Sequence, residues 1–277
     1  MNPTITWERK PLFGVPIDGL TLAQVLDLID ETIRARGRLL IGVVNVAKLV
    51  NMRRDALLRD SVLSSDVVLA DGVPVVWAMR LLRRRVPERI AGVDLMTAML
   101  ERGNTKGHRV YCLGATDEIS RITVERFGEQ YPGVRIVGRR DGYFKKEDEP
   151  QVAAEIKAAG ADILFVAMSP PKKEQFLARW FEEMGVPVCH GVGGAFDVMA
   201  GKVKRAPELW QRVGMEWFYR VLQEPRRMWK RYLVTNTLFC WMMMGELLRR
   251  DRGTKGHGDG GATRNAESLK RGESIHR

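Results

Sequence analysis

Polar side chains follow several short apolar runs of the sequence, at the points where strands would end. These positions are Asn45, Asp71, Asp117, the segment 169–173 and the segment 191–197. In a parallel sheet covered by helices, ligands bind beyond the carboxyl ends of the strands. A carboxylate there can accept a proton from a reacting hydroxyl, and cations can stabilise a negatively charged ligand. These positions are therefore the first candidates for a functional site.

Some of these candidates have an ordinary structural explanation as well. Asp71 could be the N-cap of the helix that follows it, and the spacing alone favours neither role. Gly114, in LGATDE, is more typical of a turn than of a phosphate-binding loop, because a complete GxGxxG is missing. His190 ends an apolar run and could act as a general base, although a lone histidine at such a place is more often a core residue.

The sequence offers no pattern typical of a metal site. His257 and His276 lie near the C-terminus and His108 precedes a predicted strand, so no HxxxH or HxH set exists. A DxD-type carboxylate pair is also missing. The three cysteines form no CxxC pair, which argues against structural zinc or a disulfide scaffold and suits a reducing compartment. We therefore expect no metal and no cofactor, and expect cationic side chains to stabilise any negative charge.

The elements that must position these residues follow an alternating pattern. Six runs rich in Val, Ile and Leu predict strands at 39–44, 66–70, 109–113, 134–137, 162–167 and 186–191. Segments of helical period lie between them, at 46–59, 74–84, 93–101, 118–130, 149–159 and 172–184. An earlier helix begins at a capping box formed by Thr21 and Gln24. Residues 1–200 are thus predicted to form an α/β catalytic core, a Rossmann-like, mostly parallel sheet covered by helices.

The composition changes after Gly201. Residues 202–231 contain nine basic residues against three acidic ones, a net charge of +6, together with many aromatic residues. Pro225 should interrupt a continuous helix, and residues 228–248 resume as a helix that is unusually apolar. We call residues 201–250 the appendage and expect it to be an amphipathic, helical, membrane-binding segment. Residues 251–277 are rich in Gly, Ser, Asn and charge, and are expected to be disordered.

The whole chain of 277 residues is basic, with a formal charge of +11 and a pI near 9.8. Such an excess favours an anionic partner: a nucleotide, a nucleic acid or an acidic membrane surface. The first residues lack the apolar run of a signal peptide, and the longest uncharged stretch, 232–245, falls short of the roughly 20 residues that span a bilayer. We therefore expect a cytoplasmic protein without a transmembrane helix.

Several segments occur in an order that resembles one known family. The C-terminal segment 193–233 reads GGAFDVMAGKVKRAPELWQRVGMEWFYRVLQEPRRMWKRYL. Upstream lie VPIDGLT (15–21), VNVAKLV (44–50), ADGVPVVW (70–77), GYF (142–144) and SPPKKEQF (169–176). Together they closely resemble the WecG/TagA/CpsF glycosyltransferases, glycosyltransferase family 26, over about residues 13 to 248.

This resemblance implies an inverting, metal-independent transfer of a sugar from a UDP-sugar to a polyprenyl-diphosphate-linked saccharide. The reaction would take place at the inner face of the cytoplasmic membrane, in cell-surface or exopolysaccharide synthesis, with the protein bound peripherally to the anionic lipid surface. The family's proposed base falls on Asp71. Its appendage arginines, which approach the donor diphosphate, fall on Arg220 and Arg227. The resemblance leaves a homo-oligomer open.

The resemblance also implies the surroundings of the donor. Asp197 of GAFD and Tyr143 of GYF would lie around the nucleotide, and Asn45 would lie near a sugar. Many members have Thr where this chain has Val43, and Gln where this chain has Lys173. We expect Lys173 to lie in the donor site as well. A hydroxyl and an amide are therefore replaced, so the donor sugar stays open between N-acetylmannosamine and others such as glucose.

Two other functional classes compete with this interpretation. A nucleotide-dependent oxidoreductase would need a glycine-rich first turn, but the first predicted strand runs into VVNVAK without a glycine. A non-enzymatic nucleic-acid-binding protein would interleave exposed aromatic and basic residues along a groove. The segment 232–248 is too continuously apolar for that, so membrane contact explains the appendage better and we expect no nucleic-acid partner.

Overall fold

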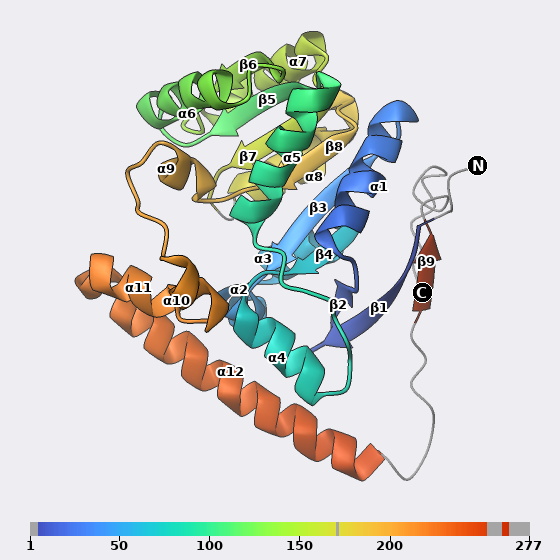
Figure 1. Cartoon of the computed structure of the whole chain (residues 1–277), viewed down its shortest axis with the longest axis vertical. Helices are drawn as coiled ribbons and strands as arrows, with labels where there is room; N and C mark the ends of the chain where they lie inside the picture. The colour runs from blue at the N-terminus through green and yellow to red at the C-terminus, as the bar shows by residue number, and fades with distance from the viewer. Residues whose placement is uncertain (1–4, 170–171, 254–261, 266–277) are drawn as a thin grey trace.

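The computed structural model of the chain describes residues 5–169, 172–253 and 262–265. Its centre is a six-stranded parallel sheet with the order β4-β3-β8-β7-β5-β6 (Figure 1). The strands are β3 (Leu39–Val44), β4 (Val67–Ala70), β5 (Arg109–Gly114), β6 (Arg135–Arg140), β7 (Ile163–Ala167) and β8 (Val188–Gly191). The predicted α/β class and all six predicted strands are therefore confirmed, with small shifts at their ends.

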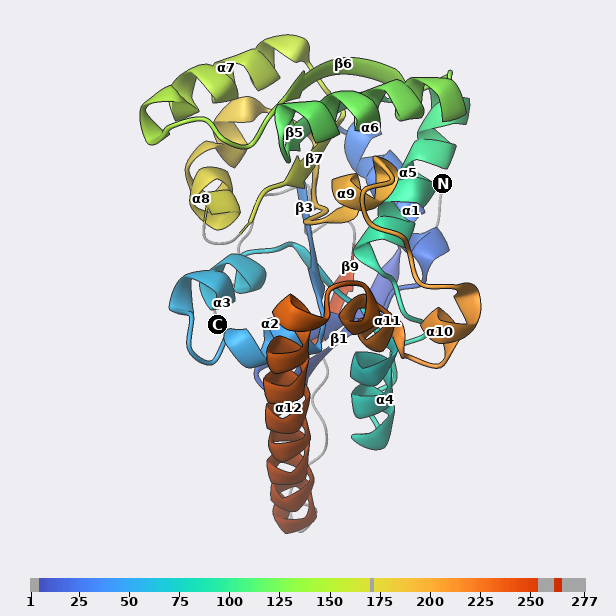
Figure 2. The ribbon, with the colours of Figure 1, turned by 90° about the vertical axis from the view of Figure 1, so that its left-hand side faces the viewer.

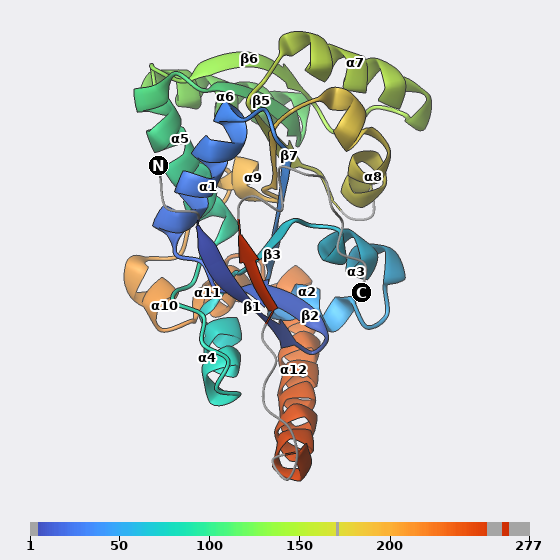
Figure 3. The same ribbon diagram turned by 90° about the vertical axis from the view of Figure 1, so that its right-hand side faces the viewer.

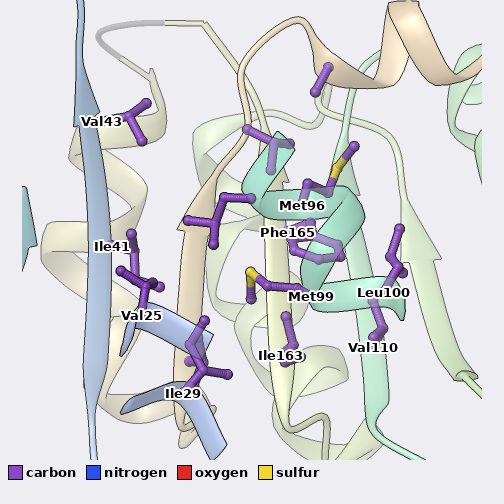
Figure 4. Packing of buried hydrophobic residues seen from close by; sticks show 14 of the residues in the cluster. Val25, Ile29, Ile41, Val43, Met96, Met99, Leu100, Val110, Ile163 and Phe165 are labelled. Atoms are coloured by element: carbon purple, nitrogen blue, oxygen red, sulfur yellow. The ribbon is translucent and has the colours of Figure 1, made fainter. Parts of the chain in front are cut away.

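Helices cover both faces of this sheet because most of its strands are apolar on both sides. On one face, α1 (Leu22–Arg34) and α5 (Gly92–Lys106) pack on Ile41 and Phe165 with α6 (Asp117–Gln130), as Figure 4 shows for the first two helices. On the other face, α7 (Glu149–Ala159) follows the short helix η1 (Lys146–Asp148) and packs beside α8 (Lys172–Met184). The central strands thus lie between two layers of buried side chains. These layers hold the strands, and therefore the edge of the sheet at which the strands end, in place.

Local signals explain where several helices begin. Thr21 and Gln24 form the predicted capping box at the start of α1. The single helix predicted over 46–59 is wrong, because the chain forms α2 (Val46–Asn51) and then α3 (Ala56–Leu63). The side chain of Asp55 accepts a hydrogen bond from the backbone N–H of Leu58 at 2.9 Å, so a new N-cap separates the two helices.

An N-terminal hairpin, β1 (Thr6–Leu12) and β2 (Val15–Asp18), was not among the predicted elements. The buried Asp18 carboxylate ties it to the sheet. It accepts hydrogen bonds at 2.7 Å from Trp7 Nε1, from Nε and Nη2 of Arg9, and from the backbone N–H of Val68 in β4. The aspartate of VPIDGLT is therefore explained by this architecture.

The C-terminal part of the chain contains α9 (Ala195–Met199), α10 (Glu208–Arg212), α11 (Glu216–Gln223) and α12 (Pro225–Gly253). The first of these lies beside α6, whereas α10, α11 and α12 lie below the sheet, and α12 extends away from it (Figures 1 and 2). Pro225 separates α11 from α12 as predicted, but it is the first residue of α12, where its missing N–H costs nothing. Phe239, Met242 and Met243 of α12 are buried in one cluster with residues of α4 (Val73–Leu81).

Residues 262–265 form a further strand, β9 (Ala262–Asn265), which pairs antiparallel with β1 (Figure 3). The expectation that the whole segment 251–277 is disordered is thus corrected for these residues, and α12 also extends to Gly253. The exposed edge of the hairpin offers unpaired backbone groups that accept a strand of almost any composition. The rest of that segment lies outside the described residues.

Across the described ranges, none of the helices combines the length and apolar character that a bilayer-spanning helix needs.

Candidate functional site

A pocket of about 420 Å³ opens at the carboxyl ends of β3, β4 and β8. Its walls come from the core and also from α10, α11 and α12, so the appendage closes one side of it. The chain leaves β3 toward β4 on one side, while β8 returns to lie on the other, and such a switch in strand order is where open sheets bind ligands. Four of the predicted site residues line this pocket: Asn45, Asp71, Lys173 and Arg220.

Asp71 lies directly after β4, and its backbone N–H donates to the carbonyl of Val44 at 2.8 Å. The helix that follows begins at Val73 and its N-cap is Gly72, without a side-chain cap. Gly72 has a φ of 112°, a conformation that favours glycine. The alternative that Asp71 caps α4 is thereby excluded, and its half-buried carboxyl group belongs to the pocket wall.

The surroundings of Asp71 raise its pKa to about 6. Burial is the largest cause, because it disfavours the charged carboxylate, and the neighbouring carboxylate of Glu216 adds to it. The positive charges of Arg89 and Lys48 act in the opposite direction. A carboxylate whose pKa lies near neutral pH is suited to accept a proton during a reaction.

Cations dominate the remainder of the pocket. Among the described residues, six cationic side chains line it, against the two carboxylates of Asp71 and Glu216. The six are Lys48, Arg89, Lys173, Lys204, Arg205 and Arg220. This excess of positive charge fits a ligand with several negative charges, such as a diphosphate.

Arg220 reaches the pocket from α11 and lies over the loop between β8 and α9. A Cβ atom placed on Gly194 would lie 3.7 Å from Nη2 of Arg220 and 3.8 Å from Oδ2 of Asp197. These two predicted residues therefore flank the same glycine, although Asp197 is not part of the pocket lining. Lys173, from α8, lies close to Gly191 in the same way, with Nζ 3.2 Å from a Cβ placed there.

Asn45 has a structural role beside its place in the pocket. Its side-chain oxygen caps α2 by accepting a hydrogen bond from the backbone N–H of Lys48 at 3.0 Å. Nζ of Lys48 in turn donates to the carbonyl of Val43 at 2.7 Å. The end of β3 and the start of α2 are thereby held in one conformation at the pocket wall.

A network of charged residues joins the core to the appendage at this pocket, and the sequence did not reveal it. Arg89 donates to Glu216 Oε2 at 3.2 Å and to Asp94 Oδ2 at 2.9 Å. Asp94 also pairs with Arg205, which follows α9. Arg205 and Glu216 belong to the segments RAP and MEWFYR, so their place in a motif could have marked them as candidates. Their partners could not be found in this way, because they lie about 110 to 127 residues away in the sequence.

Two other predicted residues are not placed in the pocket. The side chain of Tyr143 is 77% exposed on the loop after β6, and it does not line the pocket. Arg227 lies in the first turn of α12, and its side chain is outside the described residues.

His190 is explained as a core residue, the more common of its two interpretations. It is fully buried, with Nε2 3.1 Å from the carbonyl of Gly92 and Nδ1 3.5 Å from that of Ile41. Burial lowers its pKa to about 4. Gly114 is likewise structural, because a Cβ atom there would lie 2.4 Å from the carbonyl oxygen of Ala167.

Over the part of the chain that the structure describes, no three His, Cys, Asp or Glu side chains gather closely enough to hold a metal ion.

Known proteins match this chain over most of its length. Residues 10–253 match the model of the glycosyl transferase WecG/TagA/CpsF family. A relative from Bacillus spizizenii, strain W23, is 41% identical over 183 residues, which are 66% of this chain and 68% of the relative. A relative from Bacillus subtilis, strain 168, is 34% identical over 231 residues, 82% of this chain and 88% of the relative. Both are named N-acetylglucosaminyldiphosphoundecaprenol N-acetyl-beta-D-mannosaminyltransferase. The protein therefore belongs to the WecG/TagA/CpsF family of glycosyltransferases.

Proposed function

We propose that this protein transfers a sugar, with inversion and without a metal ion, from a UDP-sugar to a polyprenyl-diphosphate-linked saccharide. The observation that carries the proposal is one pocket in which a carboxylate with a raised pKa faces an excess of cations. The pocket supplies the two groups that the transfer requires: a base for the acceptor hydroxyl and positive charge for the leaving diphosphate.

In this mechanism Asp71 is the general base. Its carboxylate accepts the proton of the acceptor hydroxyl while the hydroxyl oxygen attacks the anomeric carbon of the donor sugar. The bond between that carbon and the β-phosphate oxygen breaks, and UDP leaves with the electron pair. Because the hydroxyl attacks the face opposite the leaving group, the configuration at the anomeric carbon is inverted.

The leaving UDP is stabilised by side-chain cations in this scheme. The position of Arg220 over Gly194, at the pocket, supports this role, and a guanidinium pairs with phosphate oxygens through two parallel hydrogen bonds. We also assign Arg227, in the first turn of α12, to the donor diphosphate. Asp197 and Tyr143 remain candidates for contacts to the nucleotide.

The acceptor can be assigned more specifically than the donor sugar. The relatives are named for an N-acetylglucosaminyl-diphosphoundecaprenol acceptor, which supports a lipid-linked acceptor here. N-acetylmannosamine is the donor sugar in their names, and Val43 and Lys173 line the pocket where a different sugar would be accommodated. We propose a role in exopolysaccharide, capsule or other cell-surface polysaccharide synthesis.

A lipid-linked acceptor requires the pocket to meet a membrane, and α12 supports such contact. One face of this helix is buried on the core through Phe239, Met242 and Met243. The opposite face carries exposed apolar side chains at helical spacing: Leu233, Trp241, Met244 and Leu248. With its basic residues, this face is suited to lie on the anionic inner face of the cytoplasmic membrane as a peripheral anchor.

A panel of UDP-sugars, each offered with an N-acetylglucosaminyl-diphosphate acceptor on a polyprenyl chain, tests the proposal. We expect one donor to be used in the presence of EDTA, and an α-linked donor to give a β-linked product by NMR. Failure of every UDP-sugar, a product with retained configuration, or a strict need for a divalent ion would each contradict it.

A further inference from the structure

We propose that α4 of the core is a second lipid-binding element, which forms with α12 one surface that docks on an anionic bilayer. The inference rests on the proposed function in one respect, the membrane location of the acceptor. The inference extends membrane contact to a part of the chain outside the appendage.

The outward face of α4 is apolar where an ordinary surface helix would be polar. Its inward side is buried through Val75, Val76 and Met79. Trp77 and Leu81, four residues apart and so on one face, are 55% and 58% exposed. Tryptophan and leucine on one exposed helical face are typical of interfacial elements, where the indole lies at the level of the lipid headgroups.

Positive charge surrounds these two side chains. Arg80, Arg83 and Arg85 are exposed, and the sequence has no acidic residue between Asp71 and Glu88. Each arginine near an anionic membrane adds to the electrostatic attraction. This combination of exposed apolar and basic side chains complements phosphate-bearing headgroups above an apolar interior, so the occupant that we assign is an anionic lipid bilayer.

The two helices α4 and α12 lie so that they can contact one membrane surface together. Both helices extend from the sheet toward the same end of the molecule (Figures 2 and 3). Their inward faces share one buried cluster, and Arg84 pairs with Glu246 of α12 at 2.9 Å. The helix that carries the exposed Trp77 and Leu81 therefore points to the same end of the molecule as α12.

This arrangement has a consequence for the reaction. Because α4 starts two residues after Asp71, a rigid helix of nine residues, about 13 Å long, connects the base to the lipid-facing end. Docking of α4 on the bilayer would hold Asp71 at a fixed height above the lipid headgroups. The diphosphate of a polyprenyl-linked acceptor lies at the level of these headgroups. The sugar that this diphosphate carries would then reach into the pocket.

Binding of the full chain to vesicles tests the inference. We compare the wild type, the double variant Trp77→Ser/Leu81→Ser, and the control Leu57→Ser/Leu63→Ser, which removes exposed apolar side chains from α3. The vesicles contain either phosphatidylcholine alone or phosphatidylcholine with phosphatidylglycerol. We expect the α4 variant to bind anionic vesicles about tenfold or more weakly than the wild type, and the α3 control to bind like the wild type.

A fluorescent label gives a second, independent readout. In a Cys240→Ser background, a polarity-sensitive dye is attached to Leu81→Cys or, as the control, to Leu57→Cys; the two other cysteines are buried. We expect the emission to shift to shorter wavelength on anionic vesicles for the label at 81 and to stay unchanged for the label at 57. Thermal unfolding of every variant checks that the fold is intact.

The possible failures can be distinguished. Wild-type vesicle binding by the α4 variant with no shift at position 81 would overturn the inference and leave membrane binding through α12 standing. No vesicle binding by the wild-type protein would overturn both. A shift at position 81 that follows protein concentration without vesicles would show that a second copy of the chain covers this face, and would also overturn the inference.

Discussion

At the level of single residues, the proposed reaction depends on the protonation state of Asp71. A general base works only when it is deprotonated, so transfer should be retained above the pKa of about 6 and lost as the pH falls through it. Glu216→Gln removes a negative charge that raises this pKa. We therefore expect the acid limb of the kcat/KM profile to move to lower pH in that variant.

The matched control for this prediction is Glu208→Gln. Glu208 is an exposed acid of α10 that pairs with Arg212 at 3.2 Å, outside the pocket lining. Its removal should leave the acid limb in place. An acid limb that stays unchanged in Glu216→Gln, or that moves equally in both variants, would contradict the assignment of Glu216.

Arg220 is expected to act on the leaving diphosphate. Charge-assisted hydrogen bonds contribute roughly 1.5 to 3 kcal/mol each, so Arg220→Ala should lower kcat/KM by about 10- to 100-fold. Arg220→Lys should recover only part of this loss, because an ammonium cannot form the two parallel bonds. The matched control is Arg212→Ala, which removes an exposed arginine of α10. Equal activity of the two alanine variants would remove Arg220 from the mechanism.

Some residues of the site can be identified from the sequence and others cannot, for a physical reason. Asp71, Asn45, Lys173 and Arg220 could be found because they follow strands or occur in motifs, and the structure places them in one pocket. Arg89, a lining residue that pairs with Glu216, was missed because this contact joins elements 127 residues apart. Periodicity and strand ends report local structure, and such a pair is formed only by the packing of the appendage on the core.

At the scale of elements, the two sides of α12 should respond differently to substitution. Phe239 is buried and contacts Phe13 of the hairpin turn with ring centroids 5.6 Å apart, whereas Trp241 is 67% exposed. Phe239→Ala should lower the free energy of unfolding by about 3 kcal/mol because it leaves a cavity. Trp241→Ala should leave unfolding nearly unchanged and weaken vesicle binding.

Thermal or urea unfolding and vesicle co-sedimentation of both variants check this prediction. The reverse pattern, with Trp241→Ala destabilising the fold and Phe239→Ala not, would contradict the described packing of α12. This packing also bears on the predicted core of residues 1–200, since removal of the appendage would expose the apolar cluster that α12 covers. The boundary near residue 200 stays a prediction.

The elements differ in how far the sequence could predict them. Five of the six central strands could be predicted because they are runs of mostly buried side chains. The edge strand β6, RIVGRR, is only partly buried, and only its Ile136 and Val137 gave an apolar signal. The hairpin strand β1, TWERKPL, has only two buried residues, Trp7 and Leu12, and includes a proline, so it has no apolar run. The strand β9, ATRN, has no strand-like composition at all and is defined by its backbone pairing with β1. Tertiary context, which the sequence pattern does not contain, determines both.

At the scale of the whole molecule, the charge of +11 should make membrane association depend on salt. Raising the ionic strength screens the attraction between basic side chains and anionic lipid, so binding should weaken. The apolar side chains of α12 contribute a part that salt does not screen, so binding should persist at a lower level. Co-sedimentation with anionic vesicles over a salt series measures both parts. Complete release at moderate salt would show that the apolar face does not enter the lipid.

One comparison of two proteins decides whether Asp71 is the base of a glycosyl transfer. The donor identified from the panel of UDP-sugars is bound to the wild type and to Asp71→Asn, and single-turnover transfer to the lipid-linked acceptor is then measured. Loss of a positioned base typically costs about 100- to 10,000-fold in rate. We predict a loss of that size in Asp71→Asn, with the affinity for the UDP-sugar nearly unchanged. Turnover at the wild-type rate in that variant would show that Asp71 is not the base.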